Sequence, residues 1–493
     1  MGRWTGRAAG VQKPAAYPKK LYRRLSVLLL LGYLAGVVLF YFLAGDQLHF
    51  RESRGNIELP AATGGTAELS AGITVEQRFL VKIDRLERLE IQWGTYYRPN
   101  AGTVLAELRD LQDGRTVLSG SFDAAAIPEG GLTALTAPSP IEGLYGRVLA
   151  LRISSPDGKP GSSVSPLMST AESVAEGELL IDGVPTGGVL CFRAHGSDYI
   201  WTGIHYWKLA AAGLLLLALL LLIIRQRSRR GKGSYILNAV LAVSRYRFLI
   251  RQLVSRDFKT KYKRSVLGMF WSFLNPLLMM CVQYFVFSTI FKSDIPNYAV
   301  YLLIGIVSFN FFSEACGMAL GSIVGNASLI TKVYMPKYIY PLTRVISSVV
   351  NLGISLIPLV IVSLATGVQF RKSAVLALYF LACLIIFSLG LGLLLASAMV
   401  FFRDMQFLWS VLSMLWMYAT PIFYPESILP ENLRGVLQIN PLYHFLKSFR
   451  LCILGGISPE PMVYVQCMLM ALGALIVGAV VFRKAQNRFA LYL

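Results

Sequence analysis

The strongest constraint in this sequence is a series of charge-free apolar runs, several of which approach or exceed the roughly 20 residues that a helix needs to cross a bilayer. The chain has 493 residues, of which 55% are hydrophobic. We therefore expect an α-helical polytopic membrane protein with about eight transmembrane helices. The expected spans are residues 25–44, 209–224, 266–291, 298–323, 345–365, 375–401, 407–419 and 462–481.

The formal net charge of +20 is concentrated in short segments beside these spans. Because such segments mark the cytoplasmic side of a membrane, we interpret the charge as topology and expect no nucleic-acid partner. Both termini are then cytoplasmic, in a plasma-membrane protein. A cleaved signal peptide competes with an uncleaved anchor for 25–44, but its Phe-Leu-Ala end is a poor cleavage site.

Residues 45–204 lack membrane-length runs and read as β-rich. Segments such as "QRFLVKI" and "RVLALRIS" have strand length, and "QDGR" and "SPDGKPG" are turn signals between strands. We expect an inserted all-β sandwich-like domain on the extracytoplasmic side.

The remaining organisation follows from these elements. Prolines interrupt the apolar stretch 420–457, which favours re-entrant pieces, since non-helical backbone at membrane depth needs cover from protein or a water-filled cavity. The expected parts are a basic cytoplasmic N-terminus (1–24), a span (25–44), the β-rich domain (45–204), a second span (209–224), a cytoplasmic amphipathic interface helix (236–264), a six-helix domain (266–482) with its re-entrant outer segment (420–457), and a cytoplasmic tail (483–493).

Enzyme chemistry is disfavoured. The sequence has no G-x-x-x-x-G-K-[ST] phosphate loop. The histidines at 49, 195, 205 and 444 are too scattered to indicate a metal site, and no nucleophile–base pattern stands out. We expect no cofactor and no metal on this chain.

The segment before the third span predicts an amphipathic helix. Apolar and aromatic residues recur every four positions from Tyr246 to Tyr262, and lysines and arginines occupy the other faces. Such a helix lies in the interface with lipid headgroups. It is either an anchor alone, or it also touches a cytoplasmic partner and frames a pore entrance. Its candidate residues are Arg256, Asp257, Lys259, Tyr262, Lys263 and Arg264.

Glu314 is the one acidic residue well inside an expected span. A carboxylate in lipid is costly and usually faces a bundle interior or water. It therefore belongs either to a pore or gate, or to a hydrogen bond between packed helices. Gly317, Gly321 and Gly325 on the same helix permit close helix approach.

Aromatic residues in and around the expected spans are candidates for lining a path through the membrane, because aromatic faces stack on ring-shaped ligands such as sugars. An interfacial aromatic belt or lipid-facing packing is the competing interpretation. The candidate substrate path comprises Phe270, Trp271, Phe309, Phe312, Glu314, Trp409, Trp416, Tyr418, Phe423 and Tyr424. In the β-rich domain, Trp93, Tyr96, Tyr97 and Arg98 are candidates for sugar binding, or form a core strand running into a loop.

Several motifs in residues 236–493 carry a family resemblance. They are "LVSRDFKTKYKRSVLGMFWSFLNPLLMM", "FFSEACGMALGSIVGNASLITKVYMPKYIYPL", "FFRDMQFLW", "YATPIFYP" and "INPLYHFLKSFR". In this order and spacing, the chain resembles permease subunits of ABC transporters that export O-antigen, capsule or teichoic acid. Such permeases have six spans, so the first two spans and the outer domain are a departure.

The resemblance implies a permease homodimer that works with two copies of a separate ATPase, which would hold ATP and Mg, and exports a lipid-linked polysaccharide. It also implies an ATPase-coupling helix, for which a plain basic loop is the alternative. The implied coupling residues are Asn326, Leu329, Ile330, Lys332, Val333, Tyr334, Pro336 and Lys337, with Arg403 and Asp404 as a second contact.

Two other function classes remain open. A large external domain between two spans is also the layout of a non-transporting envelope scaffold or a chain-length regulator for surface polysaccharide. An ATP-independent carrier is the third class.

Overall fold

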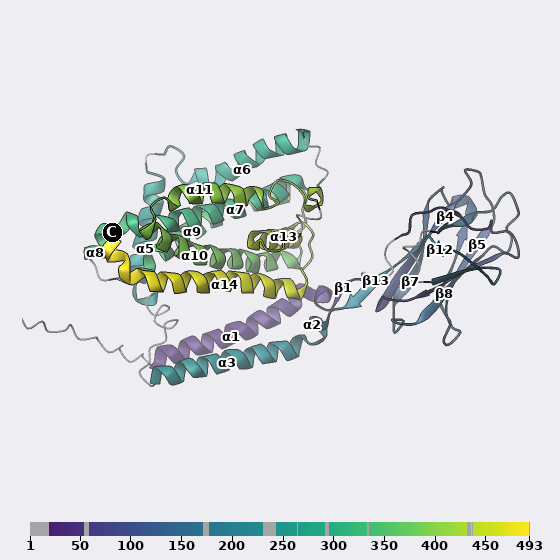
Figure 1. Cartoon of the computed structure of the whole chain (residues 1–493), viewed down its shortest axis with the longest axis horizontal. Coiled ribbons are helices and arrows are strands. Elements are labelled where there is room, and N and C mark those ends of the chain that lie inside the picture. Colours follow the sequence, from purple (N-terminus) through teal and green to yellow (C-terminus); the bar gives the residue numbers. More distant parts are fainter. Residues whose placement is uncertain are drawn as a thin grey trace, which may run out of the picture. The chain divides into compact units, whose positions relative to one another are not determined.

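The computed structural model of this chain describes residues 19–53, 59–170, 177–229, 243–263, 265–290, 295–332, 335–430, 435 and 437–492 (Figure 1). It divides into two compact units. A helical unit comprises residues 1–48 and 205–493, and a β unit comprises residues 49–204.

The helical unit contains all the long helices. Their bounds are α1 (Lys19–Ala44), α3 (Tyr206–Arg229), α5 (Arg247–Lys261), α6 (Phe270–Phe285), α7 (Tyr298–Leu320), α9 (Ile339–Ala365), α10 (Ala377–Phe401), α11 (Met405–Tyr418), α13 (Pro441–Ile453) and α14 (Pro461–Ala485). Short helices and turns are η1 (Gly45–Leu48), η4 (Val286–Ile290), η5 (Val324–Asn326), α8 (Ala327–Lys332), η6 (Lys372–Leu376), η7 (Glu426–Ile428), η8 (Gln486–Arg488) and α15 (Phe489–Tyr492).

Seven helices in the described ranges are long and apolar enough to cross a membrane. A polytopic helical membrane protein is thereby confirmed. The predicted span 407–419 is not among the seven, because α11 has 14 residues and a length of about 21 Å against a hydrocarbon core of about 30 Å. Pro421 follows its end closely, and the residue before a proline is disfavoured in a helix. The count of eight spans stays a prediction.

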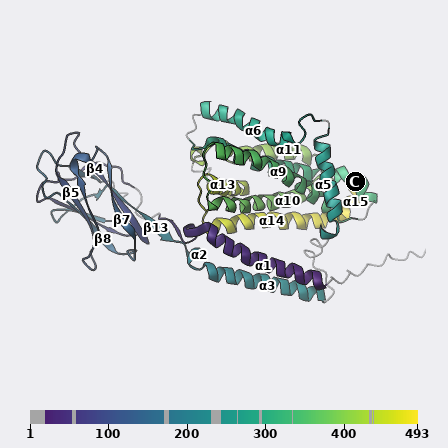
Figure 2. The ribbon, with the colours of Figure 1, turned by 180° about the vertical axis from the view of Figure 1, so that it is seen from behind.

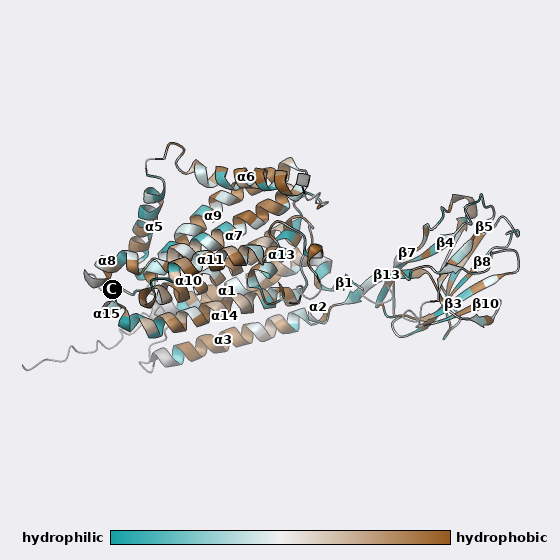
Figure 3. Ribbon diagram, turned by 45° about the horizontal axis from the view of Figure 1, so that its top comes forward, coloured by the Kyte–Doolittle hydropathy of each residue, from teal (hydrophilic) through white to brown (hydrophobic). Residues whose placement is uncertain are grey.

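The core of the helical unit is built around α7 and α10. Most of α7 is buried, and its side chains pack with those of α9, α10 and α13. Figure 3 colours α3 largely brown and α5 largely teal, which matches a lipid-length helix and a charged helix respectively.

Helices α1 and α3 run side by side, as Figures 1 and 2 both show. Two hydroxyls join them: Tyr33 donates to the carbonyl of Ala210 at 3.0 Å, and Tyr206 donates to the carbonyl of Val37 at 2.7 Å. At the end of α1, the Phe40 ring lies edge-on to the Tyr464 ring of α14, with centroids 4.8 Å apart. The pair therefore packs onto the other helices through the C-terminal end of α1.

The β unit contains two antiparallel sheets. Its strands are β1 (Phe50–Glu52), β2 (Gly64–Gly65), β3 (Thr74–Leu80), β4 (Arg85–Gly94), β5 (Thr103–Asp110), β6 (Thr116–Asp123), β7 (Leu132–Glu142), β8 (Val148–Ser154), β9 (Ser165–Ser169), β10 (Gly177–Ile181), β11 (Val184–Thr186), β12 (Val189–Leu190) and β13 (Phe192–Tyr199), with the short turns η2 (Ala124–Ala126) and α2 (Trp201–Ile204). One sheet has the order β1-β13-β4-β9-β12, with β2 paired to β9 and β7 to β4. The other has the order β11-β10-β3-β8-β5-β6.

Alternation along the strands fills the core of the β unit. In β5, Val104, Ala106 and Leu108 are buried and the residues between them are more exposed, as expected for one buried sheet face. Side chains from both sheets form one hydrophobic cluster around Ile91 and Leu151. The expectation of a β-rich domain within the membrane protein is confirmed.

A close approach between α10 and α14 predicts a stability effect. A Cβ added at Gly390 of α10 would lie 2.4 Å from backbone atoms of Ala474 and Leu475 in α14. Gly390→Ala should therefore force the helices apart and destabilise the fold by about 1–3 kcal/mol. The measurement is the thermal unfolding midpoint of the purified protein in detergent.

Gly473→Ala is the matched control, because a Cβ there meets nothing within 4 Å. It should leave the midpoint unchanged or raise it slightly, since alanine favours the helix. Equal midpoints for the two variants would show that α10 and α14 do not pack this closely.

Candidate functional site

A polar cavity of about 290 Å³ lies between α5, α6, α7 and α9. Polar groups inside a membrane bundle usually face such a cavity rather than lipid. Two aromatic side chains, Trp271 and Phe311, also contribute to the wall. The polar lining comprises Lys261, Tyr262, Ser272, Asn275, Asn310, Glu314, Ser348, Asn351 and Ser355.

Glu314 of α7 is the centre of this cavity's polar contacts. Its carboxylate accepts hydrogen bonds from Lys261 Nζ of α5 at 2.9 Å and from Asn351 Nδ2 of α9 at 2.5 Å. The Lys261 and Glu314 side chains are 41% and 29% exposed, so their ion pair is solvated and contributes only about 0–1 kcal/mol to stability. Its larger effect is to fix both charges at the cavity wall.

A second cavity, of about 640 Å³, shares Lys261 and Glu314 with the first. Its wall includes the buried Asp257 of α5, which accepts from Arg344 Nη1 of α9 at 2.8 Å. Arg256 Nη2 lies 3.2 Å from Asn326 Oδ1 and donates to it. Three cations face two carboxylates in this wall, so it carries a net positive charge. We call the two cavities together the polar route.

The interface helix α5 packs against protein along part of its apolar face. Ile250 belongs to a buried cluster with Ile339 and Tyr340 of α9, and Tyr246 and Leu249 lie against that cluster. This differs from the interpretation that the whole apolar face lies in the membrane interface. The periodicity indicated an apolar face but not which surface covers it.

Some candidate residues of the interface helix line the two cavities, and others are exposed on the protein surface. Arg256 and Asp257 line the second cavity, and Tyr262 lines the first. Lys259 and Lys263 are exposed. Arg264 lies outside the described residues.

The coupling candidates surround α8. Asn326, just before this helix, is buried and also donates to the carbonyl of Ser322 at 2.8 Å. Leu329 is exposed, whereas Ile330 lies against the cluster around Ile250 and Ile339.

The rest of the coupling segment leads into α9. The backbone carbonyl of Pro336 accepts from the N–H of Ile339, at the start of α9, at 3.1 Å. Lys337 Nζ donates to the carbonyl of Gln486 at 2.7 Å, which joins this segment to the C-terminal end of α14. Val333, Tyr334 and the side chain of Lys332 lie outside the described residues. Arg403 and Asp404 are exposed in the turn between α10 and α11.

Most aromatic candidates for the substrate path pack against other rings. Phe312 is fully buried, and its ring centroid lies 5.9 Å from Trp409, 5.2 Å from Trp416 and 6.0 Å from Phe387. Phe423 is buried and stacks on Phe287. These rings hold α7, α10 and α11 together.

Three other aromatic candidates are exposed, and one of them lines a cavity. Phe270, Trp271 and Tyr418 are exposed, and Trp271 contributes to the polar route. The Tyr424 hydroxyl donates to the carbonyl of Tyr418 at 2.7 Å. Whether these residues touch substrate stays a prediction.

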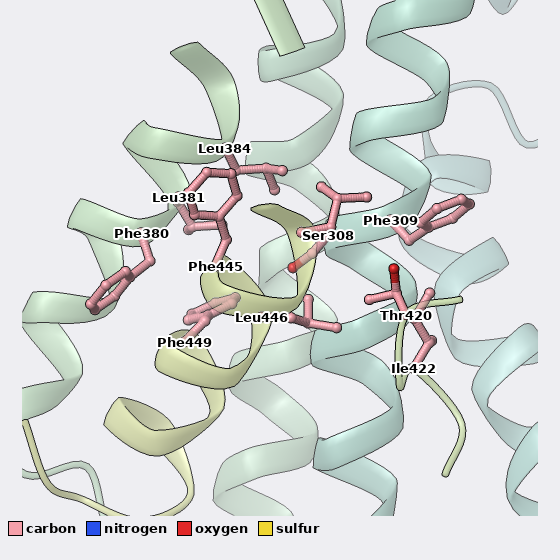
Figure 4. A pocket seen from close by; sticks show the side chains of 11 residues that line it. Ser308, Phe309, Phe380, Leu381, Leu384, Thr420, Ile422, Phe445, Leu446 and Phe449 are labelled. Atoms are coloured by element: carbon pink, nitrogen blue, oxygen red, sulfur yellow. The ribbon is translucent and has the colours of Figure 1, made fainter. Parts of the chain in front are cut away.

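Phe309 lies at a separate apolar cavity between α7, α10, α13 and the segment 420–422 (Figure 4). Its volume is about 10 Å³, which is space for about one water molecule and too small for a sugar ring. Figure 4 shows the Ser308 hydroxyl among these apolar side chains, and it has no hydrogen-bond partner among the described residues.

Arg450 of α13 is a structural residue that the sequence interpretation missed. It is buried, with its guanidinium 3.4 Å from the Tyr301 ring centroid. It donates to the carbonyls of Pro421 at 2.6 Å, Ile422 at 2.9 Å and Tyr301 at 3.2 Å. One side chain thus satisfies the non-helical backbone after α11. A lone arginine in the apolar stretch "HFLKSFR" was the available signal.

The four β-unit candidates have different environments. Trp93 is fully buried and its Nε1 donates to Thr133 Oγ1 at 2.7 Å, so it is a core residue. Arg98 is bound to Glu68, whereas Tyr96 and Tyr97 are exposed. The structure therefore leaves two of the four side chains available to a ligand.

Comparison with known proteins covers the part of the chain that contains the polar route. A sequence profile of the ABC-2 type transporter family matches residues 249–454. An O-antigen export system permease protein of Klebsiella pneumoniae is 30% identical over 247 residues, which are 49% of this chain and 93% of that protein. One from Myxococcus xanthus is 32% identical over 217 residues, 44% of this chain and 84% of that protein.

A more distant relative is named for a different polysaccharide. The polysialic acid transport protein of Escherichia coli is 24% identical over 246 residues, which are 48% of this chain and 93% of that protein. Each of these similarities covers less than half of the present chain.

The polar route predicts a pattern of solvent access along α9. Ser355 lines the cavity, whereas Ser363, two turns further along, is fully buried and donates to the carbonyl of Leu359. In a background with Cys281→Ser, which removes the exposed cysteine, Ser355→Cys should react with a charged methanethiosulfonate reagent in nanodiscs.

Ser363→Cys is the control and should react at least about tenfold more slowly, since the thiolate that reacts must be exposed to the reagent. Equal labelling rates for the two cysteines would contradict a water-filled cavity beside Ser355.

Proposed function

Since this chain belongs to the ABC-2 type transporter family, among the permeases of polysaccharide export, we propose that it is the permease subunit of an exporter that moves a lipid-linked cell-surface polysaccharide across the plasma membrane. The substrate is of the O-antigen, capsule or teichoic acid type.

The polar route is the observation that carries this proposal. A sugar polymer needs hydroxyl-bonding groups within the membrane, and the route supplies amides, hydroxyls and the aromatic face of Trp271. A phosphate between sugar and lipid carries negative charge, and the wider cavity has three cations against two carboxylates. Its position between α5 and the spans fits entry of substrate from the cytoplasmic leaflet.

Energy comes from a separate ATPase in this proposal. The sequence contains no phosphate-binding loop, so ATP and Mg belong to a partner chain, present in two copies with a permease homodimer. Support for a docking site is the short helix α8, which exposes Leu329 and is joined to α5 through Asn326 and Arg256.

The proposed topology places both termini in the cytoplasm and residues 45–204 outside. Helix α11 and the segment held by Arg450 complete an eighth crossing, and α13 lies in a re-entrant outer segment. The common hydrophobic cluster of the two sheets supports a sandwich in the β unit.

Removing the charge of Glu314 should impair export. Glu314→Gln keeps a side chain of the same size but leaves Lys261 without its carboxylate partner. We expect export to fall about tenfold, the effect of about 1.4 kcal/mol on the transport barrier. The measurement is the amount of polymer displayed on cells that produce the variant with its ATPase. Glu460→Gln, which removes a carboxylate outside the polar route, should export normally.

Disrupting α8 should uncouple the ATPase. Leu329→Glu places a charge on the exposed surface of this helix and should abolish both co-purification of the ATPase and export. Leu491→Glu, at an exposed position of α15, is the control and should preserve both. Normal ATPase binding by Leu329→Glu would remove the coupling assignment.

The same assay separates the other function classes. Export from cells that lack every candidate ATPase would identify an ATP-independent carrier. Unchanged export and an altered polymer length on deleting the chain would identify a scaffold or chain-length regulator.

A further inference from the structure

The loop between β4 and β5 has an unusual backbone. Tyr96 and Tyr97 are consecutive and both left-handed, with φ of 55° and 52°. Each such residue costs roughly 1–2 kcal/mol when it carries a side chain other than glycine's. The other non-glycine residues with positive φ in the described part are Asp182 and Asn297, which are residue types that tolerate this conformation.

A carboxylate from another loop holds this backbone in place. Glu129 Oε2 accepts from the Thr95 N–H at 2.6 Å, from the Thr95 hydroxyl at 2.6 Å and from the Tyr97 N–H at 3.3 Å. The Thr95 hydroxyl and then the Thr95 N–H lower the pKa of Glu129, so the carboxylate stays ionised at neutral pH. Asn100 adds a hydrogen bond to the carbonyl of Thr95 at 2.9 Å.

A second carboxylate positions one of the rings indirectly. Glu68 binds Arg98, and it also accepts from the N–H groups of Gly161 at 2.8 Å and Ser163 at 3.0 Å. The Arg98 guanidinium then lies 4.8 Å from the Tyr96 ring centroid. One face of Tyr96 is therefore set against a fixed cation.

Packing within the chain does not explain these constraints. Tyr96 is 48% exposed and Tyr97 is 90% exposed. The Tyr97 side chain gains little stability from packing at such exposure, yet the loop holds it at a strained backbone. Strain that the surrounding structure maintains is typical of binding sites.

We propose that Tyr96 and Tyr97 form an aromatic platform on the β unit that binds sugar rings of a polysaccharide. This rests on the proposed function, in which the transported substrate is such a polymer. The C–H faces of pyranose rings stack on aromatic rings, and a preorganised platform loses little conformational entropy on binding. A protein partner is less favoured, because the rest of the loop (Thr95, Arg98, Pro99, Asn100, Ala101) has only Pro99 and Ala101 as further apolar residues, and neither is the large apolar side chain that anchors a protein interface.

The test is affinity electrophoresis of the full chain in detergent with the surface polysaccharide extracted from the source strain. The wild-type protein should be retarded by the polymer. Tyr97→Ala should weaken binding about tenfold, equal to about 1.4 kcal/mol. Tyr97→Phe keeps the stacking surface and should bind within about twofold of the wild type.

Tyr145→Ala is the matched control, because Tyr145 is another exposed tyrosine of the β unit, 64% exposed and outside this loop. It should bind like the wild type. Wild-type binding by Tyr97→Ala would overturn the proposal, as would equal losses for Tyr97→Ala and Tyr145→Ala. Loss of a co-purifying protein with unchanged polymer binding would assign the loop to a protein partner instead.

Measuring polymer export by the same cells distinguishes a failure of this inference from a failure of the proposed function. ATPase-dependent export by a wild-type protein that does not bind the polymer in electrophoresis would refute only the platform. Polymer binding through Tyr97 without ATPase-dependent export would leave the platform intact and refute the transport role.

Discussion

A carboxylate among membrane-spanning helices needs partners, and in this protein the partners of Glu314 come from two other helices. Lys261 and Asn351 bring the end of α5 and the middle of α9 to α7. Polar side chains of α6 and α9 gather around the same point and leave a cavity rather than a packed core. The contacts of Glu314 thus join α5, α7 and α9 at the wall of the polar route, where a charge within the bundle finds polar partners.

The same contacts connect helix α8 with the cavity. Asn326 precedes α8 and accepts from Arg256 of α5, whose neighbour Asp257 is bound to Arg344 of α9. One turn further along α5, Lys261 reaches Glu314. A displacement of α8 would therefore act on α5, and α5 carries charged groups of the cavity wall. In the proposed exporter, these contacts give an ATPase at α8 a direct mechanical connection to the substrate's entrance.

The sequence predicted the features that depend on local residue patterns. It missed the side-chain contacts between residues that are far apart in the chain. Run length predicted eight spans, and seven of them correspond to described helices that are long and apolar enough to cross a membrane. The apolar residues around Glu314 identified it as the one acidic residue well inside an expected span. The hydrogen bonds of Arg450 and the ion pair between Asp257 and Arg344 join residues that are far apart in the chain. Neither periodicity nor motif spacing could indicate such contacts. For Trp93 the sequence left sugar binding and a core strand as alternatives, and it is in the core, because it occupies an inward position of β4.

Aromatic content was a weak guide to the substrate path because buried and exposed rings have different roles. Phe312, Trp409 and Trp416 form contacts that hold helices together, and moving them would disrupt the core. Trp271 and Tyr97, by contrast, have exposed surface. The exposure of Tyr97 depends on Glu129, which lies 32 positions away and fixes its backbone. A ring's availability to a ligand is therefore decided by the tertiary contacts of its backbone and neighbours, and residue type alone does not reveal it.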